Sequence, residues 1–234
     1  MSIKHIFDIT NYTQVDYPNH MACVVWFSNC NMRCDYCYNP DMLLPNSATK
    51  STTEDLIPFL KKRKNLLDAV VLSGGEATLY PDIFQLCKTI KELGYKIKLD
   101  TNGANPDIIK QLIPFLDYIS LDVKAASKEK MKQVTHTNHY DQLIQSLDIL
   151  AKSNIDYECR TTVHSKLFTQ ADILDCINLA HQHGYSNAYG VQLSMKDVPM
   201  LKKMSNTKEF NTKLIQEQSP LTVNFRNFTG ETDV

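Results

Sequence analysis

The stretch MACVVWFSNCNMRCDYC, residues 21–37, joins an apolar run to three closely spaced cysteines. Residues 21–28 are rich in β-branched and aromatic side chains and predict a buried strand. Cys30, Cys34 and Cys37 follow with the spacing C-x3-C-x2-C. Three thiolates can hold a metal centre, but they are one short of the four that close a zinc or iron–sulfur site. We therefore expect a metal centre with one open position after this strand.

The composition is that of a soluble globular protein, with 234 residues of which 43% are hydrophobic and 22% charged. The 25 basic and 26 acidic residues nearly cancel, and no long basic run is present, so we expect neither nucleic acid nor a membrane as a partner. No stretch reaches the roughly 18 apolar residues of a membrane helix. An odd number of cysteines and an N-terminus without an apolar signal argue against a secreted disulfide framework. These features favour a reducing cytoplasm.

The rest of the chain alternates strands and helices. We expect further strands over 68–72, 96–99, 118–124, 156–164 and 188–194, and helices over 52–67, 81–93, 106–116, 140–153 and 169–183. This alternation predicts a parallel sheet with right-handed crossovers. Because no break in composition marks a boundary, we expect one domain over 1–234, with a core of about 20–195 and a tail over 196–234. Within the tail, a helix near 208–216 and a strand over 221–225 are expected.

The polar residues of these strands fall on one face. Because side chains alternate between the two faces of a strand, the apolar residues of each strand share one face, which suits contact with an outer layer of helices. The other face carries Lys98, Asp100, Ser120, Asp122, Lys124, Glu158, Arg160, Thr162, His164, Gly190, Gln192 and Ser194. Burying such charges without partners costs several kcal/mol each, so the polar interior needs water or a polar ligand. We expect an α/β fold, a partial and open TIM-type barrel of about (β/α)6 with parallel strands. An open sheet with one solvated face is the alternative, although parallel sheets are usually covered on both faces.

The cysteine spacing, with Tyr36 directly before the third cysteine, resembles the hallmark of the radical S-adenosylmethionine (radical SAM) enzymes. Ser73-Gly74-Gly75-Glu76 after the second expected strand resembles their GGE element, and the resemblance covers roughly residues 14–195. More specifically, the chain resembles the activating enzymes of glycyl radical enzymes, of the type that activates anaerobic ribonucleoside-triphosphate reductase. The residues that carry this likeness are VDYP at 15–18, CYNP at 37–40, LDTNG at 99–103, LDVK at 121–124, RTTV at 160–163, and Tyr189 with Gln192.

The resemblance implies cofactors and roles. It implies a [4Fe-4S] cluster on Cys30, Cys34 and Cys37, whose open iron binds SAM. It implies SAM contacts from Tyr36, Gly74, Gly75, Glu76, Asp100, Asn102, Asp122, Lys124, Arg160, Thr162 and Gln192, with Glu76 holding the SAM ammonium. An external one-electron donor such as flavodoxin or ferredoxin would drive cleavage of SAM to a 5′-deoxyadenosyl radical. That radical would take a hydrogen from a glycine of the partner.

Two positions depart from the family pattern, since Asn19 stands where glycine is usual and Tyr38 where histidine is frequent. Asparagine tolerates positive φ, so we expect the turn at Asn19 to survive. Residues 38–73 contain no cysteine and so lack the ferredoxin-like insert of several other activating enzymes. Two alternatives stay open. The chain could be a radical SAM enzyme that modifies a small molecule or peptide, as a deazapurine synthase does, or a zinc-stabilised binding module.

Overall fold

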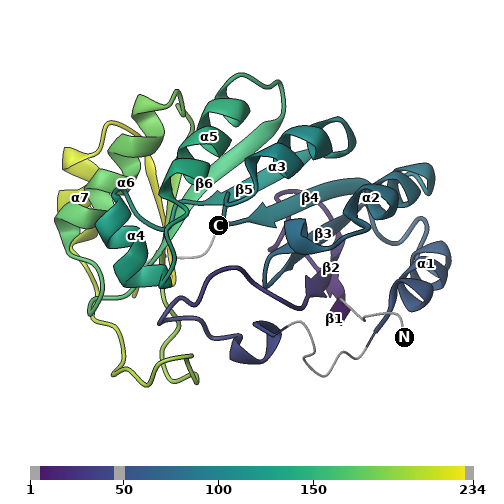
Figure 1. The fold of residues 1–234 in the computed structure, drawn as a ribbon, viewed down its shortest axis with the longest axis horizontal. Coiled ribbons are helices and arrows are strands. Elements are labelled where there is room, and N and C mark those ends of the chain that lie inside the picture. The colour runs from purple at the N-terminus through teal and green to yellow at the C-terminus, as the bar shows by residue number, and fades with distance from the viewer. Residues whose placement is uncertain (1–5, 45–50, 230–234) are drawn as a thin grey trace. The chain divides into compact units, whose positions relative to one another are not determined.

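The structure, a computed structural model, describes residues 6–44 and 51–229 (Figure 1). Its contacts divide the chain into two compact units. The first unit comprises 6–31, 41–44, 51–101 and 107–120, and the second comprises 32–40, 102–106 and 121–229. Cys30 belongs to the first unit, whereas Cys34 and Cys37 belong to the second.

The first unit is built on a mostly parallel set of strands. In order, β1 (Ile6–Thr13) runs antiparallel to β2 (Ala22–Phe27), β2 pairs in parallel with β3 (Ala69–Gly74), and β3 pairs in parallel with β4 (Lys96–Thr101). The helices that lie wholly or largely in this unit are α1 (Thr53–Lys62), α2 (Ile83–Glu92) and α3 (Pro106–Leu112), with single 3-10 turns η1 (Pro40–Met42), η2 (Ala77–Leu79) and η3 (Ile113–Phe115).

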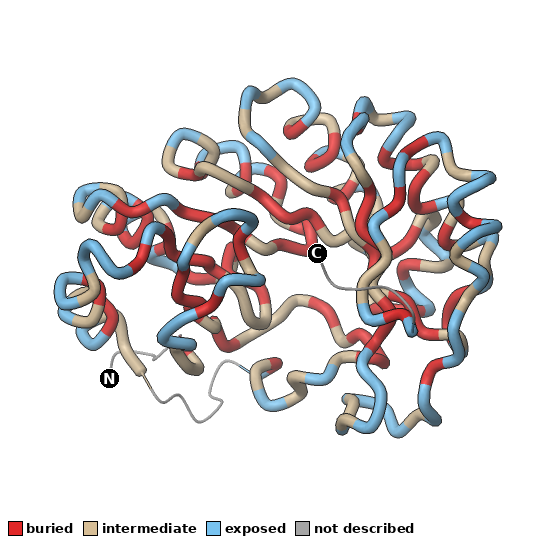
Figure 2. The backbone as a smooth tube through the Cα atoms, turned by 180° about the vertical axis from the view of Figure 1, so that it is seen from behind, coloured by how far each residue is buried: buried red, intermediate tan, exposed pale blue. Residues whose placement is uncertain are grey.

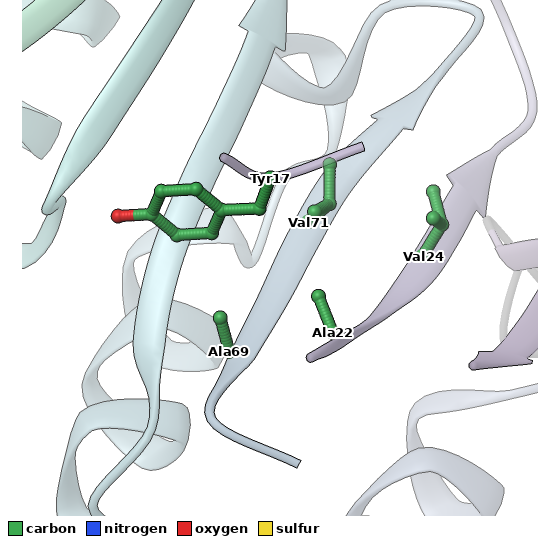
Figure 3. Close-up of a cluster of buried hydrophobic side chains, with 5 residues drawn as sticks. All are labelled: Tyr17, Ala22, Val24, Ala69 and Val71. Carbon is green, nitrogen blue, oxygen red and sulfur yellow. The ribbon is translucent and has the colours of Figure 1, made fainter. Parts of the chain in front are cut away.

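Tyr17 covers the inner face of the first unit's strands. Its ring lies against a cluster of small buried side chains, which are Ala22, Val24, Ala69 and Val71 (Figure 3). The ring centroid of Tyr17 is 4.3 Å from that of His20 and 5.6 Å from that of Tyr118. The register pairs Val71 with Lys98, so this apolar cluster lies on the same face of the strands as the polar residues of β4. The face that alternation predicted to be charged therefore also carries apolar side chains in the first unit.

The second unit holds the remaining parallel strands. β5 (Tyr118–Asp122) has its last two residues in this unit, followed along the chain by β6 (Asp156–Val163), β7 (Tyr189–Leu193) and β8 (Val223–Arg226). β6 pairs in parallel with β7, and β7 with β8. The helices are α4 (Lys128–Thr135), α5 (Tyr140–Ala151), α6 (Gln170–Gln182) and α7 (Thr212–Gln218). Figure 2 shows that their outward sides are exposed and their inward sides buried.

The predicted strands and helices are present, with differences at some ends. α1 ends at Lys62 rather than at residue 67, because Asn65 has a left-handed backbone (φ 71°) that a helix cannot include. The structure adds β1 and α4, which were not predicted. α4 is almost wholly polar in sequence, and its start is marked by the Ser127 side chain accepting the amide of Lys130. Asn19 has φ 60°, as expected for a turn that elsewhere uses glycine.

Among the helices of the described ranges, none is both long and apolar enough to cross a membrane.

Candidate functional site

The turn Gly74-Gly75 holds the chain that leads into Cys30. Gly74 has φ 111°, and a Cβ there would lie 2.4 Å from the backbone nitrogen of Phe27. A Cβ on Gly75 would lie 2.1 Å from the carbonyl oxygen of Asn29. The Gly75 amide donates to the Phe27 carbonyl at 2.8 Å. Both glycines are therefore required by a close approach of the chain's own backbone, directly before the first cysteine.

Glu76 is buried, with 1% of its surface exposed. Its Oε1 accepts hydrogen bonds from the Thr78 hydroxyl at 2.6 Å and the Thr101 hydroxyl at 2.8 Å, and from the Thr78 amide at 3.2 Å. These contacts fix the plane of the carboxylate. The sequence analysis did not single out Thr78 or Thr101, although Thr101 lies within the LDTNG stretch. A buried carboxylate held in this way can bind an ammonium group, because its charge is little screened by water.

We expect Thr101→Val to weaken SAM binding by about tenfold, since a hydrogen bond to a charged group contributes about 1.5 kcal/mol. The dissociation constant, measured by calorimetry on the iron-loaded protein, reports the effect. Thr89→Val is the matched control, because the Thr89 hydroxyl also donates one hydrogen bond, at 2.9 Å, to the Gln85 carbonyl on α2. Equal affinities in the two variants would contradict the positioning of Glu76 by Thr101.

Asp100 of β4 is bound from two sides. The Ser73 hydroxyl donates to its Oδ2 at 2.9 Å, and the Lys98 ammonium lies 2.9 Å from its Oδ1. Lys98 is almost fully buried and also donates to the Asp16 carbonyl at 2.5 Å. This lysine ties the segment 15–18 to β4, a role that alternation alone could not reveal.

A second group of candidate residues belongs to the second unit and begins with the loop that carries Cys34 and Cys37. The amide of Cys37 donates to the Cys34 carbonyl at 2.9 Å, which closes a turn between the two. None of the three motif cysteines, Cys30 included, forms a disulfide within the described part of the chain. Burial raises the pKa of Cys34 to about 11, while the charge of Lys124 acts against this rise. A metal that binds this sulfur must therefore displace its proton.

In the described ranges, no three His, Cys, Asp or Glu side chains are gathered closely enough to hold a metal ion. We therefore infer the metal ligands from the spacing and chemistry of the three thiols, and not from side chains already arranged around a metal position. The residues fit an iron–sulfur cluster, since thiolates are its usual ligands and the thiols of Cys30, Cys34 and Cys37 are not consumed in disulfides.

The loop has two sides with different partners. Tyr36 points to the inner face, where the Lys124 ammonium lies 5.9 Å from its ring centroid. The Tyr36 hydroxyl is buried and has no hydrogen-bond partner in the described part of the chain. Asp35, directly before it, points away to other partners. Its Oδ1 lies 2.5 Å from Nε2 of His136, and its Oδ2 accepts from the Lys202 ammonium at 3.0 Å.

A chain of alternating charges lines β5, β6 and β8. Lys124 lies 3.2 Å from Asp122, and Asp122 accepts from Nε of Arg160 at 2.8 Å. Arg160 also lies 3.3 Å from Glu158, which pairs with Arg226 at 2.8 Å. Burial opposes ionisation of Asp122, but the charges of Arg160 and Lys124 outweigh it and lower its pKa to about 2. The three predicted residues of this group are brought together, and Glu158 and Arg226 extend it beyond them.

Two of the remaining predicted residues, Thr162 and Gln192, lie on strands that pair beside this chain of charges. Thr162 of β6 is opposite Gln192 of β7, and Gln192 is opposite Arg226 of β8. Thr162 and Gln192 are half-buried. Asn102 follows β4, and its Oδ1 accepts the amide of Ala104 at 3.0 Å, which shapes that loop. Contact of these three residues with SAM stays a prediction.

Comparison with known proteins identifies the family. The profile of the radical SAM superfamily matches residues 24–180. A protein of Methanocaldococcus jannaschii, named for glycyl-radical enzyme activation, is 33% identical over 177 residues, which is 71% of each chain. The pyruvate formate-lyase-activating enzyme of Clostridium pasteurianum is 31% identical over 140 residues, 58% of each chain.

The solved structure of Streptococcus suis SuiB bound to S-adenosylmethionine shares the fold, with a TM-score of 0.66 at 14% identity over 88% of this chain and 50% of SuiB. The fold class expected from the sequence, a partial and open TIM-type barrel, is thereby confirmed. The chain belongs to the radical SAM superfamily and is a radical SAM enzyme whose cofactors are a [4Fe-4S] cluster and S-adenosylmethionine.

Proposed function

We propose that this protein installs a glycyl radical on a partner enzyme. The observation that carries the proposal is the 33% identity to an archaeal relative named for that activity, over 71% of both chains. The partner is a glycyl radical enzyme, and anaerobic ribonucleoside-triphosphate reductase is the one that the chain's motifs favour. Flavodoxin or ferredoxin supplies the electron, and the enzyme works in the cytoplasm.

In this proposal Cys30, Cys34 and Cys37 hold the cluster. When bound, the cluster and SAM supply a 5′-deoxyadenosyl radical after one-electron reduction. The protein's own residues bind SAM and orient it. Glu76, fixed by two threonine hydroxyls, receives the SAM ammonium. Tyr36, whose ring lies near Lys124 and whose buried hydroxyl has no hydrogen-bond partner in the described residues, supplies a donor for a bound ligand.

The charge chain on β5, β6 and β8 gives the site a rigid polar wall. Asp122 pairs with both Lys124 and Arg160, and these ion pairs restrain the two cations. Fixed charges of this kind stabilise a polar cofactor without the cost of reorganising at the moment of reaction. We propose that this wall carries the polar part of SAM, together with Asp100, Asn102, Thr162 and Gln192.

The test is anaerobic incubation of the iron-loaded protein with SAM, a reductant and anaerobic ribonucleoside-triphosphate reductase. A glycyl radical signal in the electron paramagnetic resonance spectrum of the reductase is expected. The matched control is a reductase in which the radical-bearing glycine is replaced by alanine, and it should give no signal. SAM cleavage without a radical on the reductase would favour the small-molecule or peptide alternative. A colourless protein that binds zinc and no iron would favour the binding module.

A further inference from the structure

The outer side of the cysteine loop is enclosed by two segments of the second unit. On one side lies the end of α4, where the Thr135 carbonyl accepts the Arg33 amide at 2.9 Å and the Val134 carbonyl accepts the Asp35 amide at 3.3 Å. On the other side lies the segment 195–203, yellow-green in Figure 1. Its Leu201 amide donates to the Cys37 carbonyl at 2.8 Å. The tail thus reaches the backbone of a cluster ligand.

This outer side is basic. We call the basic rim the set of basic residues on the loop, on the end of α4 and on the adjoining tail, namely Arg33, Lys132, His136, Lys202 and Lys203. Lys202 and His136 have 62% and 51% of their side chains exposed, and both contact Asp35, which is buried. Lys132 and Lys203 are exposed. The buried carboxylate of Asp35 therefore pairs with Lys202, while Lys132 and Lys203 add positive charge at the surface.

The acidic residues of the tail offset this charge only in part. Glu209 pairs with Lys196 at 3.1 Å. Asp197 accepts from the neutral amide of Asn206 at 2.8 Å and keeps its charge, a single negative charge against the four Lys and Arg charges of the rim. Leu201, an apolar residue within the tail segment that contacts the loop, is 40% exposed. Tyr38 lies instead toward Arg160, Asp122 and Lys124, whose charges act on the pKa of its hydroxyl. Exposed apolar side chains among charged neighbours are common at protein interfaces.

We propose that the basic rim, with Leu201, is the docking surface of an acidic one-electron carrier protein that reduces the cluster. The proposal rests on the proposed function and adds the place where the electron enters. One electron passes from the reduced carrier to the cluster, so the carrier is oxidised and the cluster reduced by one electron. No bond is formed or broken in this step.

The geometry favours the carrier over the glycyl radical enzyme at this surface. Asp35 and Tyr36 are neighbours in the loop, yet Asp35 contacts the rim and Tyr36 lies beside Lys124 on the inner face. A carrier on the outer side would lie near Cys34 and Cys37 while the inner face stays open to SAM and to a substrate glycine. Electron transfer slows steeply with distance, so a site in contact with the ligand loop suits a carrier. Charge complementarity also speeds the encounter of two proteins that must meet briefly.

The test uses Lys132→Glu/Lys203→Glu, a double variant that leaves the Asp35 contacts intact. Lys152→Glu is the matched control, because Lys152 is an exposed lysine of the same unit at the end of α5. At low salt, we expect reduced flavodoxin to reduce the cluster of the double variant at least about tenfold more slowly than that of the wild type. Binding of flavodoxin, measured by calorimetry, should weaken in parallel. The control should match the wild type in both measurements.

Dithionite separates the possible outcomes, because a small reductant needs no docking surface. Dithionite-driven SAM cleavage should be unchanged in the double variant. Equal reduction by flavodoxin in variant and wild type would overturn the proposal. So would loss of the reductase glycyl radical in the dithionite-reduced variant, since the rim would then serve the glycyl radical enzyme. If the wild type cleaves no SAM with dithionite, the proposed function is wrong. The docking surface is then tested by flavodoxin affinity alone: weaker binding to the double variant than to the wild type supports it, and equal binding contradicts it.

Discussion

Cys34→Ser is expected to lower the iron content of the anaerobically reconstituted protein from about four atoms per chain to near zero, since a three-thiolate site cannot lose a ligand and keep its cluster. SAM cleavage should disappear with the iron. Cys34 is the most buried of the three motif cysteines, and a serine hydroxyl there is a poor ligand for iron. Iron and sulfide analysis, with the visible absorption of the cluster, measures the loss.

Cys176→Ser is the matched control. Cys176 is buried on α6, and burial raises the pKa of its thiol to about 12, so it behaves as a small apolar side chain. This variant should keep its iron and its SAM cleavage. Loss of iron in the control but not in Cys34→Ser would show that the cluster is held elsewhere.

Asp122→Asn is expected to lower the free energy of unfolding by about 3 kcal/mol at neutral pH, because it removes the carboxylate that pairs with Lys124 and leaves Arg160 with Glu158 only. The carboxyl of Asp122 has its pKa lowered from 3.8 to about 2, so its stabilising effect is full above 3.8 and is lost as the pH falls through about 2. The difference between wild type and variant should shrink over that acid range. Denaturant unfolding at a series of pH values measures it, and a constant difference would contradict the ion-pair account.

Asp156→Asn supplies the comparison for this experiment. Asp156 begins β6 and is exposed, and the same change of charge there should alter the unfolding free energy by less than about 0.5 kcal/mol. We further expect Asp122→Asn to weaken SAM binding and Asp156→Asn to leave it unchanged. If both variants lose stability equally, the effect belongs to net charge and not to the wall of β5, β6 and β8.

The inner face could be predicted from the sequence because it depends only on strand period. Alternation within 118–124 and 156–164 was sufficient to place Asp122, Lys124 and Arg160 together, and the structure confirms their contacts. Glu158 lay on the same predicted face, but nothing in the sequence indicated its partner Arg226. That arginine lies on a short strand in the tail, 68 positions further along the chain.

The surroundings of the cysteine loop could not be predicted in the same way. Asp35 has the sequence appearance of an ordinary loop acid, and its partners His136 and Lys202 are 101 and 167 positions away. Contacts between residues so far apart in sequence depend on how the elements pack in three dimensions, and the local sequence around Asp35 does not indicate that packing. The polar helix α4 was missed for a related reason, since its sequence carries only a weak apolar stripe.

The bond between the tail and the cysteine loop has a consequence for how the protein is made. The loop obtains its contacts with Leu201 and Lys202 only after translation has passed those residues, more than 160 positions after Cys37. While the chain is still growing, Cys34 and Cys37 would lie in a loop held on one side alone, by α4. We therefore expect the cluster to be inserted after the complete chain has been released from the ribosome. Proteins that deliver iron and sulfide would then meet a loop already shaped by its tail.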